Sequence, residues 1–278
     1  MGKVFGKHFR IICKIVIIFA FLVIFINLST QISNSSEAAN DSSYIVMRAD
    51  TMEVICGDNI HKRLPMASTT KVMTALVVIE NVLPDEIVTI GDDSVGIEGS
   101  SIYLKSGEKY TVKDLLYGLM LRSGNDAATA LAIYVAGDVD SFVEMMNIKA
   151  EELGLSDTHF VNPHGLHDNN HYTSAYDLCK LGCYAMKNPL FKEIVSTKFV
   201  TVGEDGNKHY WANKNKILHN YPDGNGIKTG YTKKAGRCLV ASAYRNGVQV
   251  VSVVLNRHNM FEYCSYLMDI AFDKIEKQ

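Results

Sequence analysis

Ser68 and Lys71 have the residue types and the spacing needed for nucleophilic catalysis. They lie three residues apart in Ser68-Thr69-Thr70-Lys71, which opens an apolar stretch after Pro65. On a helix, residues at this spacing share a face, so the hydroxyl and the amine can meet. A serine becomes a nucleophile when a neighbouring base takes its proton, and a lysine whose pKa is depressed by burial can be that base. The competing interpretation is a helix-capping serine followed by a solvated lysine.

Two further short motifs contain groups that could position a peptide. Ser123-Gly124-Asn125 is predicted in a turn between two helices, where a hydroxyl beside an amide could relay a proton and orient a peptide bond. Lys228-Thr229-Gly230 is predicted on a strand edge, where a cation and a hydroxyl could bind a carboxylate. Gly230 would leave room for a ligand to approach the backbone. Taken alone, each motif is also compatible with an ordinary capped turn or an ordinary strand.

The order and spacing of the three motifs resemble those of the serine-type D-alanyl-D-alanine carboxypeptidases, the low-molecular-mass penicillin-binding proteins. The similarity spans roughly residues 43–272. The segments that carry it are residues 67–75, 123–128, 162–166, 173–178 and 226–232.

The resemblance implies an enzyme that removes the terminal D-alanine from peptidoglycan stem peptides. Ser68 would attack the carbonyl between the two D-alanines and form an acyl-enzyme, while Lys71 would accept its proton. Ser123 would help to pass a proton to the departing D-alanine. Penicillins mimic the D-alanyl-D-alanine end, so they would acylate Ser68. Peptidoglycan stem peptides and β-lactam antibiotics are therefore the expected partners.

The same resemblance implies which groups bind the substrate. Asn125 would hold the stem-peptide amide, and Lys228 and Thr229 would bind the terminal carboxylate next to Gly230. The backbone N–H groups of the nucleophile and of Tyr231 would form the oxyanion hole.

Some positions depart from the family pattern. Relatives commonly have a second arginine where this chain has Phe261 and Glu262, which leaves the details of carboxylate recognition open. Arg257 and Lys214 are additional candidates for that task. His164 is a candidate base, but the Asn-Pro-His-Gly turn that contains it favours a structural role.

Strand patterns occur near both ends of the chain. Residues 44–47 and 53–56 are predicted as two strands, and residues 238–245 and 248–255 as a hairpin. Asn246-Gly247 joins the hairpin strands and favours a type I′ turn, which needs positive φ at both positions.

The middle of the chain is predicted to be mainly helical. Thr111 would cap one helix, and Thr173 or Ser174 would cap another. The helices are expected over residues 70–82, 111–121, 126–135, 139–153, 174–185 and 261–275. The sequence therefore predicts an α/β (α+β) fold, with a β-lactamase-like antiparallel sheet built from both chain ends and an inserted helical region.

The N-terminus has the pattern of an export signal. Residues 1–14 contain Lys3, Lys7, Arg10 and Lys14 and no acidic residue, and the apolar run 15–26 follows. A count from Ile11 gives about 18 largely apolar residues, which also allows an uncleaved membrane anchor. We expect residues 1–39 to be a signal peptide or N-terminal membrane anchor, and residues 40–278 to be an exported penicillin-binding DD-peptidase catalytic domain.

The expected location follows from this organisation. The catalytic domain would lie outside the cytoplasm, in the cell wall or on the outer face of the cytoplasmic membrane. Relatives often attach through an amphipathic helix after an additional C-terminal domain. This chain ends soon after residue 272, so any membrane contact is expected at the N-terminus.

Composition narrows the function further. The net charge of −2 gives no sign of the basic face of a nucleic-acid-binding protein. Cys179 and Cys183 are four residues apart, but no His or acidic residue stands at ligand spacing nearby, which favours buried thiols over a metal pair. We expect neither a metal nor another cofactor.

Three other functions compete with that of a carboxypeptidase. A class A β-lactamase needs a deacylating glutamate in an E-x-x-L-N-like loop, which residues 151–154 do not supply. A non-catalytic penicillin sensor would not need Ser68, Lys71 and Ser123 together, and the presence of all three favours catalysis. DD-endopeptidase action on cross-links is the closest alternative and stays open.

Overall fold

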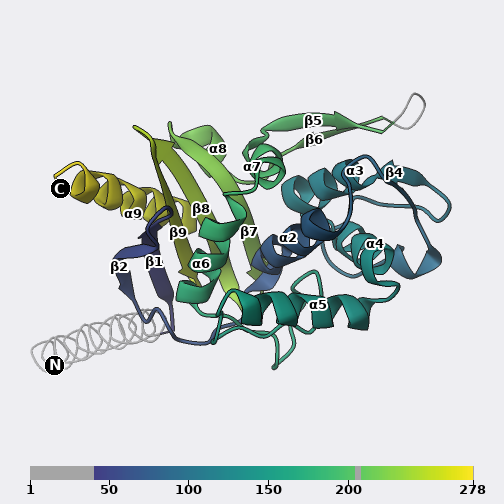
Figure 1. The fold of residues 1–278 in the computed structure, drawn as a ribbon, viewed down its shortest axis with the longest axis horizontal. Coiled ribbons are helices and arrows are strands. Elements are labelled where there is room, and N and C mark those ends of the chain that lie inside the picture. Colours follow the sequence, from purple (N-terminus) through teal and green to yellow (C-terminus); the bar gives the residue numbers. More distant parts are fainter. Residues whose placement is uncertain (1–40, 204–207, 278) are drawn as a thin grey trace, which may run out of the picture. The chain divides into compact units, whose positions relative to one another are not determined.

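A five-stranded antiparallel sheet joins strands from both ends of the chain, in the order β2-β1-β9-β8-β7 (Figure 1). This arrangement confirms the predicted sheet. At its centre β1 pairs with β9, where Ser43 lies opposite Leu255. The strands are β1 (Ser43–Arg48), β2 (Glu53–Asp58), β7 (Gly224–Thr232), β8 (Gly236–Arg245) and β9 (Val248–Leu255).

The computed structural model describes residues 41–203 and 208–277. The predicted signal or anchor, residues 1–39, lies outside these residues. Residues Ser43–Gln278 form one compact unit. Across the described ranges, no helix has both the length and the apolar character needed to cross a bilayer.

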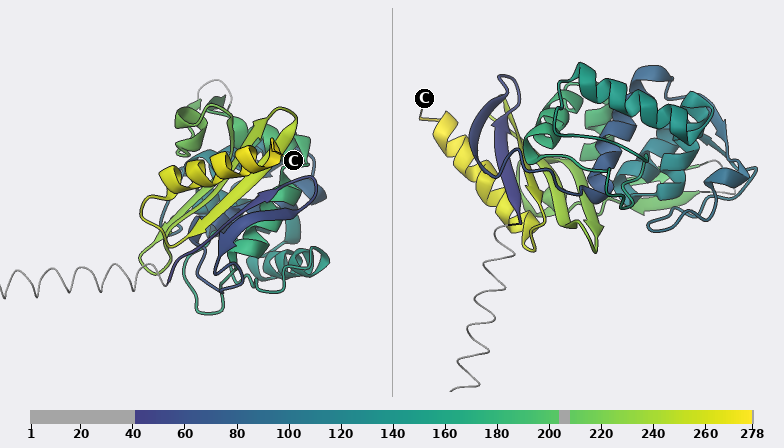
Figure 2. Two further views of the ribbon diagram at one scale, coloured as in Figure 1. Left: turned by 90° about the vertical axis from the view of Figure 1, so that its left-hand side faces the viewer. Right: turned by 90° about the horizontal axis from the view of Figure 1, so that it is seen from below.

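Both faces of the sheet are covered, as alternation along the strands shows. On β1, Ile45 and Met47 join the core shared with the helical region, whereas Val46 joins the core beneath α9 (Met260–Ile275). Successive side chains of a strand point to opposite faces, so this alternation requires cover on both sides. Helix α6 (Ala175–Ala185) packs on the face opposite to α9 (Figure 2).

The hairpin between β8 and β9 has the predicted turn. Asn246 has φ 51° and Gly247 has φ 84°, so both central residues are in the left-handed region. This is the conformation that a type I′ turn needs and that Asn-Gly favours. The register of β8 against β9 follows from this turn, with Arg245 opposite Val248.

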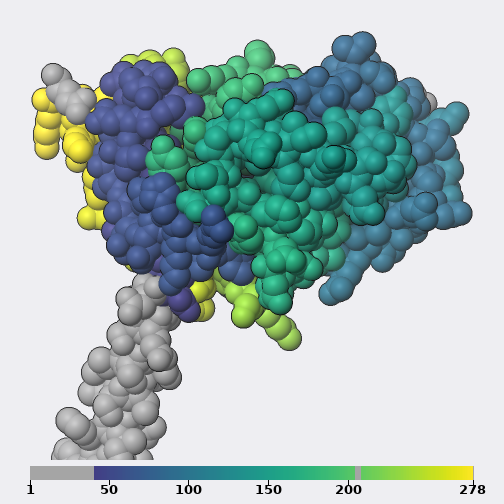
Figure 3. Space-filling view, turned by 60° about the horizontal axis from the view of Figure 1, so that its bottom comes forward, coloured from purple at the N-terminus to yellow at the C-terminus, as the bar shows by residue number. Residues whose placement is uncertain are grey.

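The helical region lies between β2 and β7 in the chain and occupies most of the face in Figure 3, in blue and teal. Its helices are η1 (Ala67–Thr70), α2 (Lys71–Asn81), η2 (Asp92–Ser94), α3 (Val112–Tyr117), η3 (Gly118–Arg122), α4 (Asn125–Ala136), α5 (Val139–Glu152), α6, α7 (Pro189–Ser196) and α8 (Ile217–Asn220). Two small hairpins that the sequence analysis did not predict accompany them. These are β3 (Ile87–Thr89) with β4 (Lys109–Thr111), and β5 (Phe199–Val202) with β6 (His209–Ala212).

Two predicted helix caps are present in the structure, whereas one predicted helix is shorter than expected. Thr111 Oγ1 accepts the Asp114 backbone N–H at 3.0 Å. Of the two candidates for α6, Ser174 is the cap, because its Oγ accepts the Asp177 N–H at 3.1 Å. The helix expected to run from Thr111 to about residue 121 is instead divided into α3 and the π-helical turn η3.

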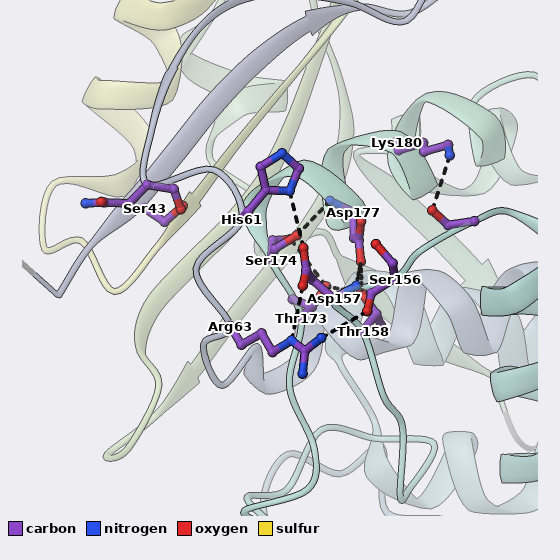
Figure 4. A network of polar contacts seen from close by, with 12 residues as sticks. Ser43, His61, Arg63, Ser156, Asp157, Thr158, Thr173, Ser174, Asp177 and Lys180 are labelled. Atoms are coloured by element: carbon purple, nitrogen blue, oxygen red, sulfur yellow. Dashed lines mark hydrogen bonds and ion pairs between the residues drawn. The ribbon is translucent and has the colours of Figure 1, made fainter.

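A polar network fixes the segment that leads into η1 (Figure 4). Leu64 and Thr173 exchange backbone hydrogen bonds at 2.8 and 3.0 Å. Arg63 donates to Asp157 at 3.1 Å, and Asp177 in turn accepts the Asp157 backbone N–H at 2.7 Å (Figure 4). The chain that enters η1 is therefore held against the loop that precedes α6.

The cysteines of the described chain are free thiols. Cys179 and Cys183 are fully buried, which confirms the interpretation as buried thiols. Within residues 41–203 and 208–277, no group of three or more His, Cys, Asp or Glu side chains is arranged to hold a metal ion.

Candidate active site

The predicted nucleophile and base meet at the start of the buried helix α2. Ser68 lies in the 3-10 helix η1 and Lys71 is the first residue of α2, with Nζ 3.2 Å from Ser68 Oγ. Residues three apart are eclipsed in a 3-10 helix, which brings the two groups together more directly than an α-helix would. Ser68 is half-buried, whereas Lys71 is fully buried.

The Lys71 amine is enclosed by hydrogen-bond acceptors. Its Nζ donates to Asn125 Oδ1 at 2.7 Å and to the His164 carbonyl at 2.6 Å. Burial, and then the charge of Lys228, hold the pKa of Lys71 well below its usual range. A neutral amine has two hydrogens and one lone pair, so the two carbonyl groups can take the hydrogens while the lone pair faces Ser68 Oγ. This geometry suits a base that removes the serine proton.

Asn125 supports the base directly. Its side chain is buried, with Oδ1 bound to Lys71, and Nδ2 donates to the Glu98 carbonyl at 2.5 Å. The sequence analysis assigned Asn125 to the substrate amide, and that contact stays a prediction. In the structure, Asn125 positions the lysine amine.

Asp126, which the sequence analysis did not single out, shapes the loop before α3. Its carboxylate accepts the Ser101 hydroxyl at 2.6 Å and the backbone N–H groups of Ile102 at 3.0 Å and Leu104 at 3.2 Å. These bonds fix the loop in which Ser100 lines the cleft. The sequence showed only that Asp126 is an acidic residue in the first turn of a predicted helix. Acidic residues are favourable at that position in any helix, so the pattern did not indicate the contacts with this loop.

The turn that contains His164 packs directly against η1. An ideal Cβ at Gly165, which has φ +89°, would lie 2.0 Å from the Ala67 carbonyl oxygen, so only glycine fits. Asn162 Oδ1 accepts the Gly165 N–H at 2.7 Å and closes the turn. The His164 carbonyl, not its ring, contacts Lys71, and burial lowers the pKa of the imidazole to about 4. These contacts favour the structural role.

A buried series of hydrogen bonds holds Ala67, the residue before Ser68. The Val161 N–H donates to His171 Nδ1 at 3.0 Å, so the ring proton lies on Nε2, which is 2.7 Å from Thr70 Oγ1. The Thr70 hydroxyl then donates to the Ala67 carbonyl at 2.8 Å. Burial lowers the pKa of His171 to about 3, so the ring stays neutral. The sequence analysis missed His171, because its partners come from distant parts of the chain.

Strand β7 brings the third motif against η1. An ideal Cβ at Gly230 would lie 3.1 Å from Ser68 N and from Met66 O, so the backbones approach closely here. Thr229, Gly230 and Tyr231 line the same cleft as Ser68. Because β7 is the edge strand of the sheet, its outer side has no strand partner in the sheet.

Two lysines give this region a positive charge. Lys228 is buried, and its Nζ donates to the Thr229 carbonyl at 3.2 Å. Burial, and then the charge of Lys214, lower the pKa of Lys228 to about 7. The pKa of Lys214, which lines the cleft, is itself lowered by burial and by Arg122. In the part of the chain that the structure describes, neither lysine forms an ion pair, so both are available to an anion.

The cleft has a volume of about 300 Å³. Ser123 lines it from the end of η3, in the left-handed region at φ 66°. Met260 and Phe261 add an apolar wall at the start of α9, where the resemblance led us to expect a nearby arginine. Arg257 does not line the cleft, because its guanidinium lies 3.4 Å from the centroid of the Tyr263 ring. The structure thus brings the three motifs together and leaves Arg257 apart from them.

Comparisons with known proteins identify the family of the chain. Residues 30–259 match a family model described as D-alanyl-D-alanine carboxypeptidase. The chain is 35% identical over 252 residues to the D-alanyl-D-alanine carboxypeptidase DacF of Bacillus subtilis, covering 87% of this chain and 65% of the relative. It is 38% identical over 226 residues to DacD of Escherichia coli, covering 77% of this chain and 57% of the relative. The chain therefore spans less than two thirds of the length of these curated relatives.

Solved structures show the same fold. A D-alanyl-D-alanine carboxypeptidase from Mycobacterium tuberculosis superposes with a TM-score of 0.78 and 31% sequence identity. The superposition covers 83% of this chain and 90% of that chain.

The Lys71→Arg variant tests the neutral-amine base. Guanidinium keeps the positive charge but does not lose its proton at working pH, so it cannot accept one from Ser68. We expect the rate of Ser68 acylation by a fluorescent penicillin to fall by several orders of magnitude, on the order of the contribution of general base catalysis. The melting temperature and near-ultraviolet circular dichroism of the variant control for folding. Near-normal acylation in a folded variant would show that another group takes the proton.

Proposed function

The chain belongs to the D-alanyl-D-alanine carboxypeptidase family, and on that premise we propose that it removes the terminal D-alanine from peptidoglycan stem peptides. The observation that supports this activity is the 3.2 Å contact between Ser68 Oγ and the buried Lys71 amine, in a cleft that also contains Lys214. A hydroxyl beside a neutral amine can attack a carbonyl carbon and become acylated. A cationic cleft favours a substrate that ends in a carboxylate.

Acylation would begin at Ser68. Lys71 removes the hydroxyl proton as Oγ attacks the carbonyl carbon between the two D-alanines, and the carbonyl oxygen becomes negative. Ser68 lies in the first turn of η1, where backbone N–H groups have no carbonyl partner within the helix. The backbone N–H of Ser68, together with the backbone N–H of Tyr231 on β7, would stabilise the oxyanion.

Collapse of the tetrahedral intermediate would release D-alanine. The C–N bond breaks, and the leaving amine takes the proton that Lys71 had accepted, with the Ser123 hydroxyl as the relay at the cleft. Water then attacks the acyl-enzyme, Lys71 accepts a proton from that water, and Ser68 is regenerated when its oxygen takes the proton back. No metal or organic cofactor takes part in this proposed sequence.

The terminal carboxylate would lie against Lys228 and Thr229. Lys228 is buried without an acidic partner in the described chain, so a substrate carboxylate would supply the missing counter-charge. Lys214, in the segment between β6 and α8, adds a second cation to the cleft. Lys228 and Lys214 would therefore bind the terminal carboxylate, a task for which the resemblance led us to expect an additional arginine.

Penicillins would react at the same serine. Their carboxylate and strained amide match the end of the peptide substrate, so attack by Ser68 opens the ring and leaves a covalent acyl-enzyme. A sensor that only binds penicillin would not need a buried Lys71 amine held by Asn125 and the His164 carbonyl. This arrangement favours turnover.

We further propose that the catalytic domain acts outside the cytoplasmic membrane. The basic residues 1–14 and the apolar run 15–26 support this location through their sequence pattern. Retention of the N-terminal segment would anchor the enzyme to the membrane, and cleavage would release it to the cell wall.

Ser68→Ala should abolish both D-alanine release and covalent labelling by fluorescent penicillin. The variant removes the only protein atom in the proposed scheme that bonds to the carbonyl carbon of the substrate. Release of D-alanine from an N-acylated pentapeptide and in-gel fluorescence measure the two activities. Undiminished labelling would contradict the assignment of the nucleophile.

Lys228→Ala should selectively impair peptides with a free terminal carboxylate. A charge-assisted hydrogen bond contributes on the order of 1.5–3 kcal/mol, so kcat/KM should fall roughly 10- to 100-fold for such a peptide. The same peptide amidated at its C-terminus is the control, because it makes no such contact. An unchanged ratio of the two specificity constants would remove Lys228 from recognition and favour an endopeptidase.

The same ratio should depend on pH in the wild-type enzyme. Lys228 is cationic in the free enzyme below its pKa of about 7 and loses its charge above it. The preference for the free carboxylate should therefore fall as pH rises above 7, whereas loss of the Lys71 proton affects both peptides alike and cancels in the ratio. A ratio that stays constant between pH 6 and about 9 would contradict this titration.

A further inference from the structure

A second pocket adjoins the cleft at Tyr231. It has a volume of about 280 Å³ and shares Tyr231 with the cleft that contains Ser68. It lies where the turn between β7 and β8 meets the loop between β9 and α9. Its lining residues are Tyr231, Lys233, Gly236, Arg237, Asn256 and His258.

The backbone around this pocket is well defined. Thr232 Oγ1 accepts the Ala235 N–H at 3.0 Å and closes the turn that contains Lys233. The Arg257 N–H donates to the Arg237 carbonyl at 2.9 Å, which ties the loop before His258 to β8. The pocket is therefore formed by hydrogen-bonded backbone rather than by two independent loops.

The pocket is positively charged and lacks a counter-charge. The sequence has no Asp or Glu between Asp223 and Glu262, and no carboxylate lines the pocket. Lys233 and Arg237 form no ion pair with any described residue. The Arg237 guanidinium lies 5.8 Å from the Tyr231 ring centroid, a cation–π contact that holds it near the cleft. These donors can receive an anion.

The direction of β7 indicates which part of a substrate would reach the pocket. Lys228 and Thr229 precede Gly230, whose backbone lies against Ser68, and Lys233 follows it. A terminal carboxylate at Lys228 places the leaving D-alanine on that side of the nucleophile. The acyl half of the peptide must then extend past Tyr231 towards Lys233.

The distance from Gly230 to Lys233 sets how many residues of the acyl half are needed to reach the pocket. Lys233 is the third residue after Gly230 and the first after the end of β7, so at about 3.3 Å per strand residue the two lie at most roughly 10 Å apart. An extended peptide covers this distance with two to three residues. A side-chain carboxylate on the first or second residue before the D-alanyl-D-alanine end can therefore reach Lys233 and Arg237.

We propose that the pocket at Lys233 and Arg237 binds a carboxylate in the acyl half of the substrate, so that the enzyme selects acidic peptides. This inference rests on the proposed carboxypeptidase function, because the direction of the substrate follows from the carboxylate at Lys228. The terminal carboxylate and the second carboxylate would lie on opposite sides of Ser68. Together they would align the scissile bond with the nucleophile.

Isosteric peptide pairs test this proposal. Each pair ends in D-alanyl-D-alanine, is acetylated at its N-terminus and has Glu or Gln at the first or the second residue before that dipeptide. In the wild type, we expect the Glu peptide of at least one pair to have a kcat/KM about twofold to fivefold higher, the range for a carboxylate near exposed cations. The preference should decrease as salt is added.

Two substitutions and a matched control locate the effect. Lys233→Gln and Arg237→Gln should each reduce the preference for Glu and leave kcat/KM for the Gln peptides close to the wild-type value. Lys109→Gln removes an exposed lysine on β4, away from the pocket, and should keep the full preference. No preference in the wild type, or a preference that survives both pocket substitutions, would overturn the proposal.

Binding without turnover separates this inference from the proposed function. The same peptide pairs are titrated calorimetrically into the Ser68→Ala variant, with and without Lys233→Gln. A preference for Glu that Lys233→Gln removes supports the pocket, even if the wild type releases no D-alanine and the proposed function fails. Equal affinities for Glu and Gln peptides overturn the pocket, even if the wild type hydrolyses both.

Discussion

The burial of the Lys71 amine is the constraint on which the rest of the site depends. An ammonium group in this position would be costly to desolvate, so the fold must supply acceptors and favour the neutral form. The acceptors come from two separate parts of the chain, Asn125 at the start of α4 and the His164 carbonyl in the turn before α6. Each of these elements is fixed by further hydrogen bonds, from Asp126 and from Asn162 respectively. Two separate parts of the helical region therefore hold the Lys71 nitrogen in place.

Close approach of backbones explains how η1 is held between its neighbours. Gly165 lies against the Ala67 carbonyl, and Gly230 lies against the N–H of Ser68. A side chain at either position would push η1 away from the turn or from β7. The hydrogen bonds that lead from His171 to Thr70 and from Thr70 to Ala67 hold the same Ala67 carbonyl. Ser68 is thus placed by contacts to the backbone of η1, and its hydroxyl contacts the Lys71 amine.

Local sequence features predicted the parts of the fold that depend on local physics. The turn at Asn246-Gly247, the cap at Thr111 and the i, i+3 spacing of Ser68 and Lys71 need only neighbouring residues. Contacts between distant segments were not predictable in the same way. The bond from His171 to Thr70 is such a contact, because it joins residues 101 positions apart. Three features that are closer in sequence also went unpredicted: the hairpin of β5 and β6, the division of the helix after α3 and the stacking of Arg257 on a tyrosine ring. The family resemblance supplied the roles of the three motifs, whereas the geometry added the groups that hold them.

The pairing of β1 with β9 has a consequence for the order of synthesis and folding. Ser43 finds its partner Leu255 only after the helical region and β8 have been made, and β7 reaches Ser68 only slightly earlier. Pairings between such distant segments close large loops and form slowly compared with local helices. The nascent chain therefore contains Ser68 long before it contains a cleft. The cleft beside Ser68 forms only when β7 lies against η1, after the helical region has been made.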